Sequence, residues 1–513
     1  MTVTSFSFLV LLLAGMLLYY LVPRRAQWII LLCLSLVYYY YAAVPYTMLY
    51  LLVSTAVAYI STNLLYCKKI KERGRLISGI AIAGVLINVL IWFILKGSSF
   101  WTVGMRLFQK AFPAVHAQSS IPVVAALGMG YYTSQVIGYI LDCYWGISVP
   151  QKNPFKLFLF VCFFPQLTVG PISKYSQLQG LYEQHKFSYQ NLCFGCQRIL
   201  WGFFKKLVIS DRVAILVNSI WADAETYNGL WPWIAVLLYP IEIYSDFSGC
   251  VDIVLGAAEL FDIKLPENFK NPFMARTVQE FWQRWHITLG AWAKDYVYYP
   301  VLKSKFLISL RRWTKKRFSK RLAKLIPWTF GMGVLWFVMG FWHGSLRHII
   351  GVSAWYWLIL VLGEIFQPIF ERCRQGFHIE EECFSWRLFQ RIRTYLIFSI
   401  GSVFFSAESL RGALRRYDIL FHSVNRLNPW VLFDGSIQNL GVTWIDINLI
   451  IFGVYLLCRV AYLREIYEYA RIWMKKQILP YRWLIWIVLF FCVIIYGLYG
   501  PGYDASSFIY QGF

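Results

Sequence analysis

The stretch Glu280-Phe-Trp-Gln-Arg-Trp-His-Ile-Thr-Leu-Gly290 places a histidine directly after a tryptophan in a chain that is otherwise mostly apolar. The stretch Gly340-Phe-Trp-His-Gly344 repeats this pairing further along. An ionisable ring at membrane depth is energetically costly, so such a residue is a candidate for a functional site. His286 and His343 lie 57 residues apart (343 − 286), and they can meet only if the fold brings separate helices together. The two stretches therefore predict a reaction centre inside a membrane protein.

The composition is that of a polytopic helical membrane protein. Of the 513 residues, 58% are hydrophobic and 15% are charged. Apolar runs near the roughly 20 residues that span a bilayer recur along the chain, at residues 6–22, 28–43, 47–66, 76–95, 121–141, 349–370, 445–463 and 483–499. Shorter or interrupted runs cover residues 155–168, 199–217, 231–244, 327–342 and 395–405. We expect an all-α fold with about a dozen spans, forming one integral-membrane domain over residues 1–513, because no soluble segment reaches domain size.

Basic residues predict the orientation and a membrane-surface helix. Loops rich in lysine and arginine after the first, third and fifth runs place the N-terminus outside, because basic loops stay in the cytoplasm. Residues 303–324 hold ten basic residues and no acid, interleaved with residues such as Phe306 and Trp313. This pattern indicates an amphipathic cytoplasmic helix on the membrane, explained by topology and attraction to anionic lipids. Docking of a phosphorylated acyl donor or an acidic carrier protein is the functional alternative, and no nucleic-acid partner is expected.

The cysteines predict neither a metal site nor a bound cofactor. Most of the eleven stand singly inside apolar runs, where a small side chain packs well. Cys193 and Cys196 form a C-x-x-C pair, but no second pair and no histidine stand at zinc-binding spacing.

Three carboxylates stand in an apolar segment ahead of the first histidine stretch. Glu242, Asp246 and Asp252 surround Ser248 and Gly249, a combination that suggests either a closely packed helix or a broken one. Broken helices occur at membrane depth only where they are buried in protein or line a water-filled cavity. Asp246 and Asp252 are therefore candidates for supporting the site or binding substrate.

The histidine stretch itself carries a set of polar neighbours. Glu280 and Arg284 are four residues apart and are expected to pair on one helix face. Trp285 precedes His286, and Asp295 follows as a source of counter-charge. Residues 277–300 are too polar to lie in lipid, which predicts a re-entrant or protein-buried helix pair. All these residues, with Trp342 beside the second histidine, are candidate supporting residues.

The remaining histidines are expected to be ordinary surface residues. They stand in polar loops or at the edge of a span, at His116, His185, His348, His378 and His422. For the two histidines that follow tryptophan, structural roles also stay open: an interhelical hydrogen bond for the second, and a charged network for the first.

The motifs, taken in order, resemble the membrane-bound O-acyltransferase (MBOAT) family. The chain is similar to its bacterial branch, which contains the alginate O-acetyltransferase membrane subunit and the D-alanyl transfer protein of teichoic acids. The matching motifs cover roughly residues 125–345 and lie at residues 164–172, 244–253, 265–268, 281–286, 295–296 and 340–344. Residues 404–408 and 508–513 extend the resemblance and favour the longer alginate-type branch. Cys250 and Val251 stand where relatives often have Tyr-Ser, which leaves the details of acceptor binding open.

The resemblance implies a fold, a reaction and partners. It implies a ring of tilted helices with re-entrant segments around a central reaction tunnel, in a bacterial plasma membrane. The family moves an acyl group from a thioester, here acetyl-CoA as donor substrate, to a hydroxyl. His343 matches the family histidine and would be the general base, because a neutral imidazole can accept the hydroxyl proton. His286, oriented by Arg284 or Asp295, would position the donor or polarise its carbonyl.

The acceptor side of the reaction is expected to involve a second protein. The longest candidate outer segment, residues 408–441, is too short for an independent active site. The resemblance therefore implies a membrane-anchored or secreted esterase-like partner that passes the acetyl group to an exopolysaccharide such as alginate.

Three alternatives to polysaccharide O-acetylation stay open. D-alanyl transfer from a carrier protein to teichoic acid is the first. A polysaccharide or lipid transporter is the second, although the sequence shows no inverted repeat. A non-catalytic scaffold is the third, although the presence of both His286 and His343 argues against it.

Overall fold

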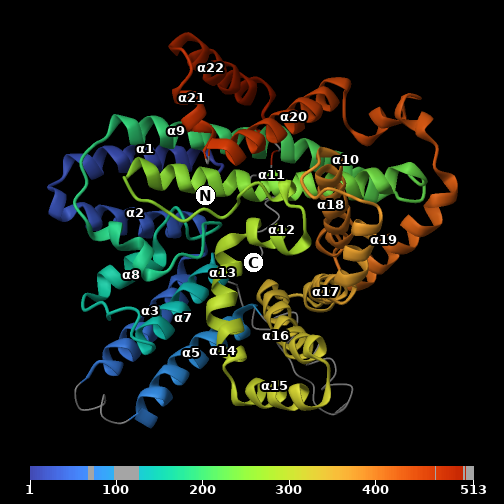
Figure 1. The fold of residues 1–513 in the computed structure, drawn as a ribbon. Coiled ribbons are helices and arrows are strands. Elements are labelled where there is room, and N and C mark those ends of the chain that lie inside the picture. The colour runs from blue at the N-terminus through green and yellow to red at the C-terminus, as the bar shows by residue number, and fades with distance from the viewer. Residues whose placement is uncertain (68–73, 97–125, 468, 501–502, 504–513) are drawn as a thin grey trace, which may run out of the picture. The chain divides into compact units, whose positions relative to one another are not determined.

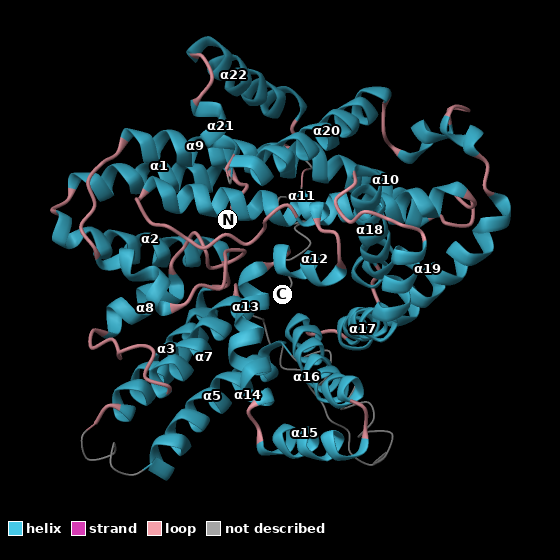
Figure 2. Cartoon of the chain, viewed as in Figure 1, coloured by secondary structure: helices cyan, strands magenta, loops and turns pink. Residues whose placement is uncertain are grey.

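The computed structural model describes residues 1–67, 74–96, 126–467, 469–500 and 503. Within these residues the regular elements are all helices, as predicted, and Phe269 and Trp285 form an isolated bridge (Figure 2). Features predicted at residues 68–73 and 508–513, at His116 and in the first part of the run 121–141 lie outside the described residues.

The described chain forms two compact units. The first contains Met1–Trp201 and Cys250–Pro266, and the second contains Gly202–Gly249 and Glu267–Tyr503. The prediction of a single domain over residues 1–513 stays a prediction.

The first unit is built from the predicted N-terminal spans. Helices α3, α5 and α7 pack on one another, and α2 packs on α1 and α8 (Figure 1). The bounds are α1 (Phe6–Leu21), α2 (Gln27–Ala42), α3 (Met48–Leu65), α5 (Gly74–Lys96), α7 (Met129–Tyr144), α8 (Pro154–Cys162) and α9 (Tyr189–Phe203). The limits of α1, α2, α3 and α5 agree with the predicted apolar runs to within two residues. Helix α8 ends six residues before the end of the run 155–168, and α9 begins ten residues before the run 199–217.

Helix α11 (Leu230–Leu260) contains the three predicted carboxylates and is not broken. Gly249 allows a close approach instead: a Cβ there would lie 2.9 Å from the carbonyl oxygen of Gly202 and 3.2 Å from the amide nitrogen of Lys206. Of the two readings of this segment, close packing is therefore the right one.

The second unit holds both histidine stretches. Helix α16 packs on α15, α17 and the π-helical turn η7, and α18 packs on η7 and α19 (Figure 1). The bounds are η4 (Phe204–Ser210), α10 (Asp211–Ala222), α12 (Val278–Arg284), α13 (Ile287–Ala293), η6 (Lys294–Tyr298), α14 (Tyr299–Leu302), α15 (Lys305–Arg317), α16 (Lys320–His343), η7 (Arg347–Val352), α17 (Ser353–Gly376), α18 (Phe384–Ser406), α19 (Leu410–Ser423), α20 (Trp444–Tyr467), α21 (Ala470–Lys475) and α22 (Leu479–Tyr496).

The basic segment 303–324 is not one helix, contrary to the prediction. Helix α15 ends at Arg317, and Ser319 has an extended backbone and caps α16 by accepting the amide N–H of Leu322. The basic residues from Lys320 onward therefore belong to α16. This helix has 24 residues, which corresponds to about 36 Å at 1.5 Å per residue, so it is long enough to span a bilayer although its apolar run is short.

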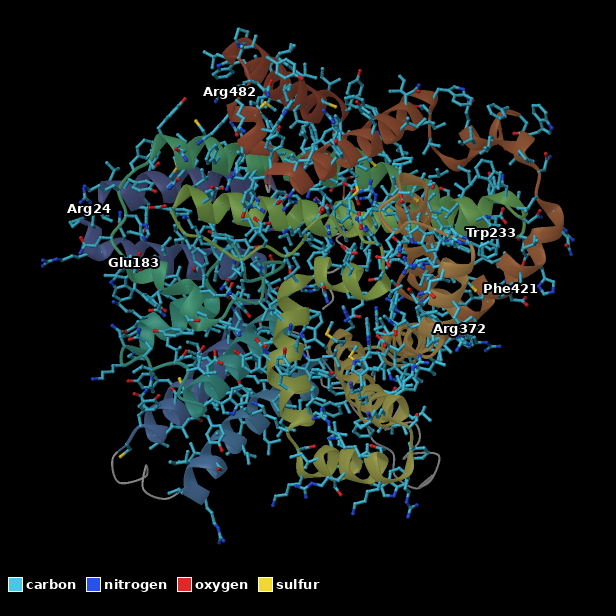
Figure 3. All side chains as sticks on the ribbon, in the orientation of Figure 1. Arg24, Glu183, Trp233, Arg372, Phe421 and Arg482 are labelled. Carbon is cyan, nitrogen blue, oxygen red and sulfur yellow. The ribbon has the colours of Figure 1, made fainter. Side chains whose placement is uncertain are left out.

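Seven helices among the described residues are long and apolar enough to cross a membrane, and α1 is a shorter apolar helix. They establish a multi-pass membrane protein, whereas the expected count of about a dozen spans stays a prediction. Residues 408–441, the segment predicted to lie outside the membrane, contain α19, in which the side chain of Phe421 is 72% exposed (Figure 3).

Candidate functional site

The first histidine occupies a tight turn between two short helices, as the polar segment 277–300 predicted. His286 lies between α12 and α13 with φ 46° and ψ 51°, a left-handed conformation that is uncommon for a residue with a side chain. The turn is held from outside, because the amide of Ile287 donates to the carbonyl of Asn268 (2.9 Å) and the amide of Lys270 donates to that of Arg284 (2.9 Å). Such a conformation costs free energy and persists only where its surroundings impose it.

Asn268 determines which ring nitrogen of His286 carries the proton. Its fully buried Oδ1 accepts from the amide of Thr288 (3.1 Å) and from the Thr288 hydroxyl (2.9 Å), so this atom is an acceptor. The 3.2 Å contact from His286 Nδ1 to the same oxygen is therefore an N–H donation. The neutral ring then has its basic lone pair on Nε2. Burial lowers the pKa of His286 to about 3, so the imidazole is neutral at physiological pH.

A tryptophan joins the two predicted histidines. The ring of Trp342 lies 5.9 Å from that of His286 and 5.0 Å from that of His343, edge to face in both cases. Phe247 from α11 contacts His286 as well, at 4.9 Å. The structure thus brings together two histidines that stand on separate helices, at the start of α13 and the end of α16, within a single unit.

Arg284 anchors the turn rather than the imidazole. It pairs with Glu280 (2.8 Å), as the spacing predicted, and with Glu465 of α20 (2.5 Å). Trp285 is buried and stacks on Phe281, which makes it a packing residue of the turn. Asn268, which the sequence did not single out for this purpose, holds the ring of His286.

A buried ion network lies at the junction of η4 and α11. Lys206 Nζ lies 2.8 Å from Asp246 and 2.9 Å from Asp211, and the side chains of Lys206 and Asp246 are only 2% and 1% exposed. Lys205 donates to the hydroxyl of Ser248 at 2.8 Å. The sequence analysis did not predict a role for these two lysines. Their position inside the apolar run 199–217 was a signal that could have indicated a buried ion pair.

The two aspartates of α11 have different partners. Asp252 belongs to the first unit and pairs there with Arg198 at 2.9 Å. Asp246 belongs to the second unit and its lysine network. Asp295 lies in the π-helical turn η6. The part of the chain that the structure describes has no group of three or more His, Cys, Asp or Glu side chains arranged to hold a metal ion.

Part of the chain is similar to a known protein family. The sequence profile of the membrane-bound O-acyltransferase family matches residues 151–313. A protein of Pseudomonas putida named as a probable alginate O-acetylase is 29% identical over 58% of the chain and 56% of its own length. Residues 151–313 are therefore similar to the membrane-bound O-acyltransferase (MBOAT) family.

Other relatives have different acceptors in their names. A peptidoglycan O-acetyltransferase of Helicobacter pylori is 27% identical over 65% of the chain and 63% of its own length. A teichoic acid D-alanyltransferase of Bacillus subtilis is 25% identical over 54% of the chain and 69% of its own length. The matches with the first alginate O-acetylases span 56–60% of the length of those proteins.

The other histidines of the chain depart in part from the prediction. His378 and His422 are exposed, as expected. His185 and His348 are buried, so the expectation of solvated side chains was wrong for both. His185 bonds to Asp262 through Nδ1 (3.1 Å) in the first unit. A polar neighbour in sequence says little about burial when a turn directs the side chain inward.

Proposed function

We propose that the chain is a membrane O-acyltransferase that moves an acetyl group from cytoplasmic acetyl-CoA across a bacterial plasma membrane for O-acetylation of an extracytoplasmic polysaccharide. The observation that carries the proposal is the contact of His286 and His343 with the same tryptophan, in a chain whose residues 151–313 match the MBOAT family. The relatives named as O-acetylases of alginate and peptidoglycan support acetyl as the acyl group.

The chemistry needs one proton acceptor near the thioester. The acceptor hydroxyl oxygen attacks the thioester carbonyl carbon while His343 takes the hydroxyl proton. The C–S bond then breaks, an ester forms, and the thiolate of coenzyme A receives the proton from the imidazolium. General-base catalysis of this kind contributes about 10²- to 10⁴-fold in rate.

His286 suits a role toward the acceptor. With Nδ1–H donated to Asn268, its Nε2 is an acceptor, which orients a hydroxyl group and cannot polarise a carbonyl oxygen while the ring is neutral. We therefore assign His286 to accepting a hydrogen bond from another donor group beside the attacking hydroxyl, because the single proton of that hydroxyl goes to His343. The ion pair of Lys206 and Asp246 joins η4 to α11 one residue before Phe247, whose ring contacts His286.

The central test replaces the base. Purified protein with the substitution His343→Ala should release thiol from acetyl-CoA, in the presence of an acceptor, about 10²- to 10⁴-fold more slowly than the unchanged protein. His422→Ala, on the exposed face of α19, is the matched control and should keep full activity. Full turnover in a folded His343→Ala protein would contradict the proposed role of His343. Absence of thiol release by the unchanged protein would instead favour a transporter or scaffold.

Helix α15 is the proposed docking surface for the donor. It carries five basic residues in its last two turns, and only Leu307 and Thr314 among its residues are buried. Reversing Arg311, Arg312, Lys315 and Lys316 should raise the KM for acetyl-CoA, and the difference should shrink as salt screens the charges. An unchanged KM would leave α15 as an element for topology and lipid contact.

The acceptor polymer would be reached through a partner protein. The outer segment around α19 exposes Phe421, Trp430 and Phe433 but offers no fold of its own that could bind a polysaccharide chain. We propose that a membrane-anchored or secreted esterase-like protein takes the acetyl group on a hydroxyl and passes it on. Affinity purification from native membranes should recover it. Efficient acetylation of a long polysaccharide by the purified chain alone would refute this transfer through a partner protein.

D-alanyl transfer is the second candidate, favoured by the teichoic acid D-alanyltransferase among the relatives. Offering the purified protein acetyl-CoA and a D-alanyl carrier protein in parallel distinguishes the two. Thiol release from acetyl-CoA alone supports the O-acetyltransferase, whereas consumption of the D-alanyl carrier alone supports the alternative.

A further inference from the structure

A third histidine lies directly against the proposed base. His348 is in the π-helical turn η7, and its imidazole stacks on that of His343 with ring centroids 5.0 Å apart and planes 21° from parallel. Its side chain is more deeply buried than that of His343, with 1% against 9% exposure. A histidine buried at this place calls for a reason, because neither acyl transfer nor the membrane fold requires a third imidazole here.

The ring of His348 is itself held on two sides. The hydroxyl of Ser345 lies 2.6 Å from its Nδ1. Phe405 of α18 contacts both imidazoles, with centroids 5.0 Å from His348 and 5.8 Å from His343. The backbone is also closely packed, since a Cβ at Gly340 would lie 2.6 Å from the carbonyl oxygen of His348. Neighbours from α16, α18 and the intervening turn thus locate this ring.

We propose that His348 is a positioning residue, whose stacked ring sets the plane of the His343 imidazole so that its basic nitrogen faces the acceptor hydroxyl. The inference rests on the proposed function. His343 is the last residue of α16 and is followed by Gly344 in a left-handed conformation, so no further helical turn restrains it. Rotation about the terminal side-chain bond of a histidine is soft, and a small misplacement of a reacting group can cost about 10²-fold in rate.

The alternative is that His348 only fills space. In that case any apolar side chain of similar volume would serve, whether flat or branched. The stacking role instead requires a flat ring. The substitutions His348→Phe and His348→Leu separate these two roles, because both remove the nitrogens and both fill the site.

The experiment compares kcat and KM for acetyl-CoA in purified protein with these two substitutions and with Ser345→Ala, which leaves both rings in place. His348→Leu should lower kcat about 10- to 100-fold with KM within about twofold, whereas His348→Phe should stay within about fivefold of the unchanged protein. Ser345→Ala should lower kcat by a smaller factor, again with little change in KM. The exposed His422→Leu is the matched control, and melting temperatures in detergent report folding.

Two results would overturn the inference: a His348→Leu protein with normal kcat, or a folded His348→Phe protein as slow as His348→Leu. If the His348→Leu protein fails to fold, His348→Phe is compared with Ser345→Ala instead. A slow His348→Phe protein together with a normal kcat in Ser345→Ala would then contradict positioning by the ring. His343→Ala in the same assay separates this inference from the proposed function. If His343→Ala is inactive while His348→Leu is normal, only the positioning role fails. If His343→Ala is fully active, the proposed base itself is wrong.

Discussion

Asn268 is the position where a single change should affect both the fold of the site and its chemistry. Its Oδ1 accepts from the His286 ring and from both the amide and the hydroxyl of Thr288, all buried. The substitution Asn268→Ala removes this acceptor from three donors. A buried donor deprived of its acceptor costs about 1–3 kcal/mol, so the loss should reach about 3 kcal/mol or more, a large part of the roughly 5–15 kcal/mol that stabilises a typical domain.

The substitution Asn268→Asp provides the matched comparison. It keeps an acceptor oxygen for the three donors but places a negative charge beside His286 Nδ1. An adjacent carboxylate favours the imidazolium, so the pKa of His286 should rise from its low value. Because the acceptor is kept, the Asn268→Asp protein should be more stable than the Asn268→Ala protein. If the reaction needs the neutral ring, the activity of the Asn268→Asp protein should be lost on acidification at a higher pH than in the unchanged protein.

The measurements are melting temperature in detergent and thiol release from acetyl-CoA between about pH 5 and pH 8. Asn268→Ala should melt lower and turn over about 10²-fold more slowly, because the ring of His286 is no longer oriented. The reasoning is refuted if Asn268→Ala keeps the melting temperature and kcat of the unchanged protein, or if Asn268→Asp has an unaltered pH profile.

Three further predictions concern the surroundings of the site. Lys206→Met should destabilise the protein by about 3–5 kcal/mol, because it leaves a buried carboxylate without its partner. Adding Asp246→Asn should recover part of this loss. If chemical or thermal melts show that the losses of the two substitutions simply add, the two residues do not stabilise each other. The pKa of His286 is lowered from 6.5 to about 3 in the folded protein. The unfolded chain therefore binds a proton at this residue at a higher pH than the folded protein does, so the free energy of unfolding should fall as the pH drops from about 6.5 toward 3. The substitution His286→Gln should flatten this dependence, and equal slopes in both proteins would count against it. Gly340→Ala should lower the melting temperature and kcat together, because the new methyl group overlaps the hydroxyl of Ser353, an overpacking typically costing about 1–3 kcal/mol; a neutral result would mean that η7 shifts freely.

The sequence by itself determined the class of the protein and the histidines that matter most. The long apolar runs predicted the helices because a bilayer requires helices with internally satisfied backbone groups. His286 and His343 stood out because an ionisable ring in such a chain is costly. The pair of Glu280 and Arg284 followed from helical spacing alone, since residues four apart share a face.

Only the tertiary structure decided which side chains surround these histidines. Asn268 reaches His286 because a left-handed turn folds the connector back onto α13, and no local pattern encodes that contact. His348 was expected at the surface, yet a π-helical turn directs it onto His343. The pairing of Lys206 with Asp246 depends on the close approach of η4 and α11 at Gly249. Contacts between residues distant in the chain depend on how helices pack, whereas the position of each helix depends on the composition of its own segment.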